Sequence, residues 1–128
     1  PMVMTAHIVL EEIDPDTPVT LSKKGIALLR DSLGLEGLLM SDDISMGALS
    51  DDLRANCNGA LSAGCDVVLH CNGNLDEMRV VAESGPMRPA AVKRADIALS
   101  ARRTPIDIDI DATEAEFRGL VVNGLIKD

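Results

Sequence analysis

Residues 37–46 read Gly-Leu-Leu-Met-Ser-Asp-Asp-Ile-Ser-Met, an apolar run that passes directly into acidic side chains. Residues 35–40 predict a strand with both faces covered, because their side chains are mostly apolar at successive positions. Ser41, Asp42 and Asp43 are expected to close this strand. In parallel α/β folds, the loops at the carboxyl ends of the strands carry the active site. Asp42 and Asp43 are therefore candidates for a functional site, although either carboxylate could instead cap the following turn.

Strands and helices alternate along most of the chain. Apolar runs predict two further strands, at residues 2–10 and 65–71. Apolar residues at helical spacing, with capping residues at the ends, predict four helices. The first is expected to be capped by Ser22 and ended by Gly34, and the others to cover residues 50–63, 75–82 and 90–102. This spacing favours parallel pairing through right-handed crossovers, so we predict an α/β fold with three parallel strands.

Two segments depart from this alternation. Residues 14–18, Asp-Pro-Asp-Thr-Pro, should break the chain after the first strand, because each proline fixes its own φ and disfavours helix in the residue before it. Residues 106–110 alternate apolar and acidic side chains, which predicts an exposed strand, and Thr113 with Glu116 fits a capping box for a short last helix. We therefore expect an α/β unit over residues 1–104 and a strand and helix tail over residues 105–128.

The composition disfavours several classes of partner. The 128 residues carry 12 basic and 21 acidic side chains, a net charge of −9, and a single aromatic residue, Phe117. Nucleic acid is disfavoured, because basic side chains would have to neutralise its phosphates and stacking needs aromatic or arginine platforms. The chain has no apolar run of the roughly 20 residues that span a bilayer and no signal-like start, so we expect no membrane partner. Pro1 is not an initiator methionine, which leads us to expect a processed or partial chain.

The cysteines favour reduced thiols. Cys57, Cys65 and Cys71 are odd in number and lie in or beside apolar stretches, which is typical of buried structural thiols. A zinc site of Cys65, His70 and Cys71 would lack a second pair of ligands. In addition, Cys65 and His70 would project from opposite faces of a strand.

The aspartates near the carboxyl end have the spacing of a calcium loop. Asp107, Asp109 and Asp111 occupy its first, third and fifth positions, but Ala112 and Arg118 stand where the loop needs Gly and Glu. A solvated acidic strand is therefore the favoured interpretation. We expect no metal and no other cofactor.

The two histidines offer weak functional signals. His7 is expected on the first strand, near the end that faces the candidate loops, and His70 near the carboxyl end of the third strand. A histidine on an apolar strand is more often a hydrogen-bonded core residue than a catalyst. The sequence contains neither a G-x-S-x-G elbow nor a Gly-rich phosphate loop. Two classes remain at this point, a glycosidase-like segment with a carboxylate nucleophile and a small signalling domain with an acidic pocket.

Four motifs, in order, resemble the bacterial β-N-acetylhexosaminidases of glycoside hydrolase family 3. They are Met4-Thr5-Ala6-His7-Ile8-Val9, Asp14-Pro15 with Pro18-x-Thr20-x-Ser22, the stretch 37–46, and Ala63-Gly64-Cys65-Asp66-Val67-Val68-Leu69-His70-Cys71-Asn72-Gly73. The resemblance covers about the first 80 residues, with helical continuation to Arg102. It implies the carboxyl-terminal portion of a (β/α)8 TIM-type barrel, here incomplete, in which three parallel strands alternate with helices.

The resemblance also implies an activity, namely removal of a terminal β-linked N-acetylglucosamine with retention of configuration. Asp42 matches the family's nucleophile, a carboxylate that stabilises the oxocarbenium-like transition state and forms a covalent glycosyl-enzyme. Asp42 must then be ionised, and we expect Asp43 to turn towards backbone donors or another partner. His7 and Met46 are expected to contact the sugar. For this family, recycling of peptidoglycan fragments in the cytoplasm is the usual implication.

One part of the family's machinery has no counterpart in the sequence. The general acid/base of the family is a His-Asp dyad on a Lys-His-Phe-Pro-Gly-His-Gly-type loop, and neither His7 nor His70 belongs to such a segment. A complete barrel takes about 250 residues. We therefore expect little activity from the chain alone. We also expect open sheet edges that pair with the missing amino-terminal half or with a second copy.

Two alternatives stay open on the sequence. A receiver-like phospho-acceptor domain has a similar length and clustered aspartates, but its acidic pair follows the first strand, whereas Asp42 and Asp43 follow the second. The other alternative is a non-catalytic interaction domain that dimerises through its sheet edges.

Overall fold

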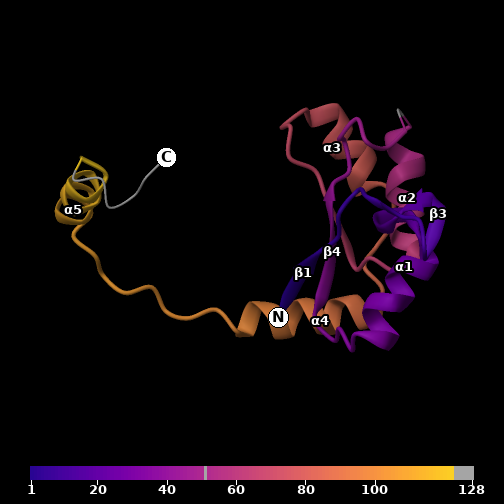
Figure 1. Ribbon diagram of the computed structural model, residues 1–128, viewed down its shortest axis with the longest axis horizontal. Coiled ribbons are helices and arrows are strands. Elements are labelled where there is room, and N and C mark those ends of the chain that lie inside the picture. Colours follow the sequence, from indigo (N-terminus) through magenta and orange to yellow (C-terminus); the bar gives the residue numbers. More distant parts are fainter. Residues whose placement is uncertain (51, 123–128) are drawn as a thin grey trace.

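Three parallel strands form the central sheet of the computed structural model, which describes residues 1–50 and 52–122 (Figure 1). They are β1 (Met2–Met4), β4 (Leu38–Asp43) and β5 (Val67–Leu69). Their order in the sheet is β1-β4-β5, and Met2 pairs with Leu38 while Met40 pairs with Val67. The predicted α/β fold with three parallel strands is confirmed. Spatial neighbours are also neighbours in chain order, unlike the 2-1-3 order of receiver-type sheets.

The helices lie close to their predicted positions. They are α1 (Lys23–Ala27), α2 (Leu53–Ala63), α3 (Leu75–Ala82) and α4 (Pro89–Ser100). Ser22 caps α1 as predicted, because its Oγ accepts the N–H of Gly25 at 3.0 Å. After α1 the helix widens over Leu28–Ser32, where the N–H of Leu33 reaches back five residues to the carbonyl of Leu28.

The start predicted for α2 at Ser50 is wrong. Asp52 caps this helix instead, and its Oδ1 accepts the N–H of Ala55 at 2.9 Å. The hydroxyl of Ser50 instead donates to Oδ1 of Asn56, inside the helix, at 2.7 Å. Gly64 ends the helix with a φ of 126°, a backbone conformation that residues with a Cβ atom rarely adopt.

The strand predicted over residues 2–10 is split in two. β1 ends at Met4, and β2 (Val9–Leu10) turns away to pair antiparallel with β3 (Asp14–Pro18). The prediction that residues 14–18 only break the chain is therefore wrong. Two prolines are tolerated there because a two-stranded ribbon leaves one edge of β3 unpaired, so a missing N–H costs no ladder bond.

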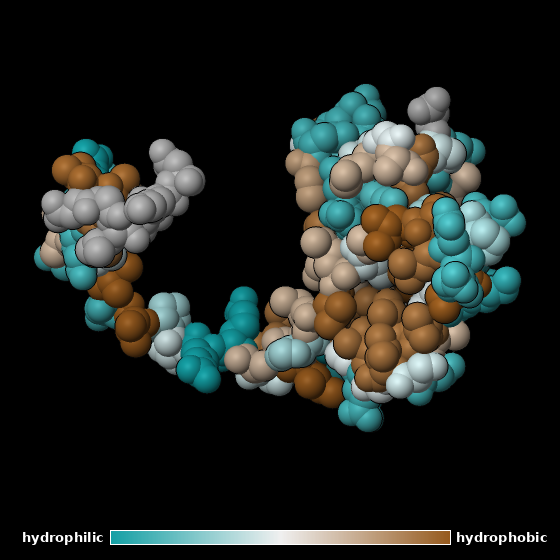
Figure 2. All heavy atoms as spheres, viewed as in Figure 1, coloured by the Kyte–Doolittle hydropathy of each residue, from teal (hydrophilic) through white to brown (hydrophobic). Residues whose placement is uncertain are grey.

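The predicted burial of the first strand is also wrong. Met2 is 56% and Met4 51% exposed, because β4 is the one strand that pairs with β1 in the described part of the chain. In Figure 2, hydrophobic residues gather over the region in which Figure 1 draws β1 and the lower part of β4. This edge of the sheet is open to solvent.

The boundaries of the other two strands also shift. β4 extends through Ser41, Asp42 and Asp43, which were expected to follow it, and starts at Leu38 rather than Leu35. Ser41 is buried, and its Oγ accepts the N–H of Leu69 at 2.9 Å where the β4–β5 register is irregular. A side chain thus replaces a backbone acceptor, which lets the strand continue. β5 is shorter than the predicted 65–71.

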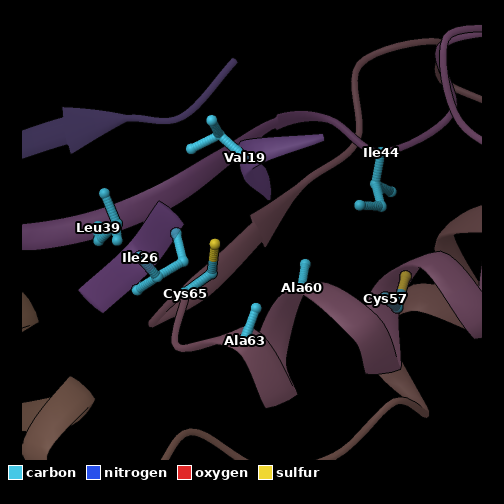
Figure 3. Close-up of a cluster of buried hydrophobic side chains, with 8 residues drawn as sticks. All are labelled: Val19, Ile26, Leu39, Ile44, Cys57, Ala60, Ala63 and Cys65. Carbon is cyan, nitrogen blue, oxygen red and sulfur yellow. The ribbon is translucent and has the colours of Figure 1, made fainter. Parts of the chain in front are cut away.

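The core lies between the sheet and helices α1 and α2 (Figure 3). Its buried members are Val19, Ile26, Leu39, Ile44, Cys57, Ala60, Ala63 and Cys65. Small side chains on α2 allow this helix to approach the strands closely. Cys57 and Cys65 are buried as predicted, whereas Cys71 is exposed because β5 ends before it.

The tail differs from its prediction. Residues 106–110 do not pair as a strand, and an extended segment leads from α4 to α5 (Ile110–Val122), which stands apart from the α/β unit (Figure 1). The expected capping box at Thr113 is wrong. Asp109 instead accepts the N–H of Ala112 at 3.0 Å, so the helix begins earlier and Thr113 lies inside it. Residues 123–128 of the predicted tail lie outside the described residues.

Candidate functional site

The carboxyl ends of β4 and β5 bring the candidate residues to one edge of the sheet. Asp42 is half-buried near the end of β4, and its Oδ1 accepts the N–H of Asp43 at 2.8 Å. The Asp43 carboxylate binds a different group, since its Oδ1 accepts the N–H of Ser45 at 3.1 Å and the Ser45 hydroxyl at 2.8 Å. The expectation that Asp43 turns towards backbone donors is confirmed, and the two carboxylates have separate partners.

Hydrogen bonding favours the ionised form of Asp43. Burial alone raises the pKa of its carboxyl group, but the N–H and hydroxyl of Ser45 and the backbone of Cys71 outweigh this effect. The nearby His70 acts in the same direction, and the pKa of Asp43 therefore lies below its ordinary value. These bonds favour a carboxylate anion at Asp43, the last residue of β4.

His7 lies in the bend after β1, so its expected position on a strand is wrong. Its Nε2 lies 2.8 Å from the backbone carbonyl of Asp43, and its Nδ1 lies 2.8 Å from the Thr20 hydroxyl. A carbonyl only accepts, so Nε2 carries the hydrogen of the first bond. Both ring nitrogens have partners within the chain. Contact of His7 with the sugar stays a prediction.

His70 forms a second cluster beside Asp43. Its side chain is only 5% exposed and its Nε2 lies 2.8 Å from Glu77 on α3, whereas its buried Nδ1 has no hydrogen-bond partner among the described residues. Glu77 also accepts from Asn72 at 2.6 Å and from Asn74 at 3.1 Å. The hydrogen bond from His70, followed by that from Asn72, lowers the pKa of Glu77.

The sequence assigned no role to two members of the site, Glu77 and Thr20. Glu77 follows Asn74 at capping-box spacing at the start of α3, a signal that could have placed Glu77 beside the β5–α3 loop. Thr20 lies in a motif that resembles the family, but only the folded chain brings it to His7.

Met46 lies on the same loop as Ser45 and is exposed. It lines a cavity of about 220 Å³ together with Ile44, Ser45, Gly47, Ser50, Leu53, Asn56 and Glu77. Asp42 is not among these lining residues. The structure therefore brings Met46 near the partners of Asp43 and leaves its contact with a sugar as a prediction.

Among the described residues there is neither a metal-binding cluster nor a membrane-spanning helix. They contain no group of three or more His, Cys, Asp or Glu side chains placed to hold a metal ion. Cys65, His70 and Cys71 do not form such a group, nor do Asp107, Asp109 and Asp111. Within the same residues, every helix is too short or too polar to cross a bilayer.

Comparison with known proteins identifies the family. Residues 1–103 match the model of the glycosyl hydrolase family 3 N-terminal domain. The chain belongs to this family. A β-hexosaminidase of Bordetella avium is 36% identical over 121 residues, which are 92% of this chain and 33% of that protein. A β-hexosaminidase of Alkalilimnicola ehrlichii is 44% identical over 75 residues, 56% of this chain and 21% of that protein.

Solved structures of the family share the fold. CbsA from Thermotoga neapolitana has a TM-score of 0.65 at 30% identity, over 83% of this chain and 26% of that one. The β-N-acetylglucosaminidase from Thermotoga maritima has a TM-score of 0.64 at 28% identity, over 81% of this chain and 26% of that one. This glycoside hydrolase family 3 chain thus spans about a third or less of the length of these relatives. Its described strands match part of a barrel and do not close one.

Proposed function

We propose that this chain forms the nucleophile-bearing part of a retaining β-N-acetylhexosaminidase, with Asp42 as the nucleophile. The observation that carries the proposal is the placement of Asp42 at the carboxyl end of β4, with one carboxylate oxygen held by the N–H of Asp43. Active sites of barrel enzymes form at this end of the strands. The second acidic side chain is held by Ser45, so the adjacent carboxylates are directed to separate partners.

The chemistry assigned to Asp42 is a double displacement. A carboxylate oxygen attacks the anomeric carbon, the bond from that carbon to the aglycone oxygen breaks, and the leaving oxygen takes a proton from a general acid. Water then opens the glycosyl ester and restores the carboxylate. The dyad loop that supplies the acid in this family has no match in the sequence. General acid/base assistance is worth about 10²–10⁴-fold, so the chain alone should turn over very slowly.

The substrate class in the proposal is a saccharide with a terminal β-linked N-acetylglucosamine. Relatives named β-hexosaminidase and a solved structure named β-N-acetylglucosaminidase support this class. The proposal extends to fragments of peptidoglycan as the physiological substrate and to the cytoplasm as the location, on the strength of the motif resemblance alone.

Complementation tests the proposal. The chain would be co-expressed with the Bordetella avium β-hexosaminidase from which the matching segment has been removed, and assayed with a chromogenic β-N-acetylglucosaminide. We expect turnover that Asp42→Asn reduces by about 10³-fold or more, the scale of removing one catalytic group. Asp16→Asn, at an exposed position of β3, is the matched control and should keep the activity. Equal turnover with Asp42→Asn and with the unchanged chain would overturn the assignment.

The open edge of β1 supports a second element of the proposal, a partner strand. β1 pairs on one side with β4, and its methionines are largely exposed. An unpaired apolar edge is a template for another strand. We propose that this strand comes from the amino-terminal half of the barrel when it is present, and from a second copy when it is absent.

A further inference from the structure

A chain of hydrogen bonds leads from the core to the backbone beside Asp42. The hydroxyls of Thr5 and Thr20 lie 2.8 Å apart, and both side chains are buried. Thr20 lies 2.8 Å from Nδ1 of His7, whose Nε2–H donates to the carbonyl of Asp43 at 2.8 Å. The imidazole therefore connects two buried hydroxyls to one backbone carbonyl of β4.

The peptide group between Asp43 and Ile44 is held from both sides. Its carbonyl accepts from His7, and its N–H donates to the carbonyl of Leu69 in β5 at 2.8 Å. The preceding N–H, that of Asp43, donates to Oδ1 of Asp42 at 2.8 Å. Fixing the plane of the peptide group between Asp43 and Ile44 restricts the backbone rotations of Asp43. It thereby restricts the N–H that holds the Asp42 carboxylate.

We propose that His7 is a positioning residue, which orients the Asp42 carboxylate by holding the carbonyl of Asp43. The role of Asp42 in this statement rests on the proposed function, whereas the hydrogen bonds do not. A sugar hydroxyl would have to displace one of two existing partners to bind the ring nitrogens of His7. A side chain without a donor would leave the Asp43 carbonyl with one hydrogen bond fewer and its peptide group free to tilt about the bond to Leu69.

The experiment measures amide hydrogen exchange by NMR in the full 128-residue chain. His7→Leu removes the donor, whereas His7→Gln retains a side-chain N–H at a similar distance from the backbone. Thr20→Val removes the hydroxyl that orients the ring, and Thr20→Ser keeps it. Ser22→Ala is the matched control, because it deletes another buried hydroxyl, which donates to Asp14 at 2.6 Å and does not touch Asp43.

We expect His7→Leu to speed exchange of the Asp43 amide about tenfold relative to the Leu39 amide, the size of one lost hydrogen bond. His7→Gln and Thr20→Ser should restore most of the protection, and Thr20→Val should lose part of it. Ser22→Ala should leave the ratio of the two amides unchanged. A merely structural role of His7 would speed both amides equally, and that result would overturn the proposal.

A measurement on the unchanged protein covers the case in which His7→Leu does not fold. The proposal requires a slowly exchanging Nε2 proton on His7 with a scalar coupling across the hydrogen bond to the carbonyl carbon of Asp43, and the absence of this proton would overturn it. Failure of the proposed function gives a different result. Asp42→Asn would then keep the complemented activity while the exchange pattern of Asp43 stayed as expected.

Discussion

The guanidinium of Arg30 lies 2.7 Å from the carboxylate of Asp66, which is 3% exposed. The same Oδ2 atom accepts the N–H of Leu39 at 2.9 Å and Nε of Arg94 at 3.1 Å. Arg30 also donates to the carbonyl of Gly37 at 2.7 Å. This carboxylate therefore joins the start of β4, the segment before β5 and helix α4, at the end of the sheet opposite Asp42.

Replacing Asp66 should destabilise the fold strongly. Asp66→Asn leaves two partly buried guanidinium groups without their carboxylate, a change that typically costs about 3–5 kcal/mol, and the partial exposure of both arginines favours the lower end. The measurement is the free energy of unfolding in urea. Asp76→Asn is the matched control, because the Asp76–Arg79 pair is exposed and worth less than about 1 kcal/mol. Equal losses in the two variants would contradict the structural role of Asp66.

Gly64 should not tolerate a side chain. Its φ of 126° disfavours any L-residue, and an added Cβ would lie 2.8 Å from Cγ2 of Ile26 in the core. Gly64→Ala should therefore lower the stability by about 1–3 kcal/mol, measured by thermal unfolding. Gly47→Ala serves for comparison, because a Cβ added there would meet no atom within 4 Å and the φ of Gly47 is not positive. A variant at Gly64 as stable as the one at Gly47 would refute the clash.

The stability that the Ser45 hydroxyl contributes to the folded chain should depend on pH. The pKa of Asp43 is lowered in the folded chain, so its contribution is complete above the ordinary value of 3.8 and is lost as the pH falls through the folded pKa. Ser45→Ala removes the hydroxyl that donates to this carboxylate at 2.8 Å, and the backbone N–H of residue 45 remains. The variant should be less stable than the unchanged chain at pH 7, and this difference should shrink below pH 3.8.

The measurement for Ser45 is the free energy of unfolding at several pH values, with Ser100→Ala as the control. Ser100 donates to the carbonyl of Ile97 and touches no carboxylate through that bond. Its effect should not vary with pH. A pH-independent loss in Ser45→Ala would show that the hydroxyl of Ser45 does not favour the ionised form of Asp43.

The three thiols should react at different rates. Burial, followed by the charge of Asp66, raises the pKa of Cys65 to about 11, and burial also raises the pKa of Cys57. Cys71 is exposed. Iodoacetamide at a pH of about 8 should therefore label Cys71 first in the folded chain and all three residues in urea, as read by peptide mass spectrometry. Rapid labelling of Cys65 without denaturant would contradict its place in the core.

The open edge of β1 should cause self-association when the chain is alone. Val3→Lys places a charge on β1 and should shift the chain towards the monomer, as measured by sedimentation velocity across concentrations. Leu99→Lys, on an exposed face of α4, should leave the association unchanged. A chain that is monomeric at every concentration would exclude a second copy as the strand partner, and the amino-terminal half of a barrel would then be the one proposed partner left.

Local patterns in the sequence were sufficient to locate the helices of residues 1–104 approximately and to predict the class of fold. α3 covers the predicted residues 75–82, and Ser22 caps α1 as expected, because the signals for both lie within a few residues of one another. The chain order of the strands and the motif around Asp42 also indicated a family that the comparison confirmed. These features depend on neighbours in the chain, which a sequence displays directly.

Pairing between distant residues required the tertiary structure. The apolar run at residues 2–10 did not reveal that Val9 would leave the sheet to pair with Pro18, nor did Ser41 reveal that its hydroxyl would extend β4 by bonding Leu69. His7 likewise was expected on the first strand, whereas its two partners, Thr20 and Asp43, hold it in the bend after β1. A hydrogen bond forms where two groups meet in space, and such meetings depend on the packing of the whole chain.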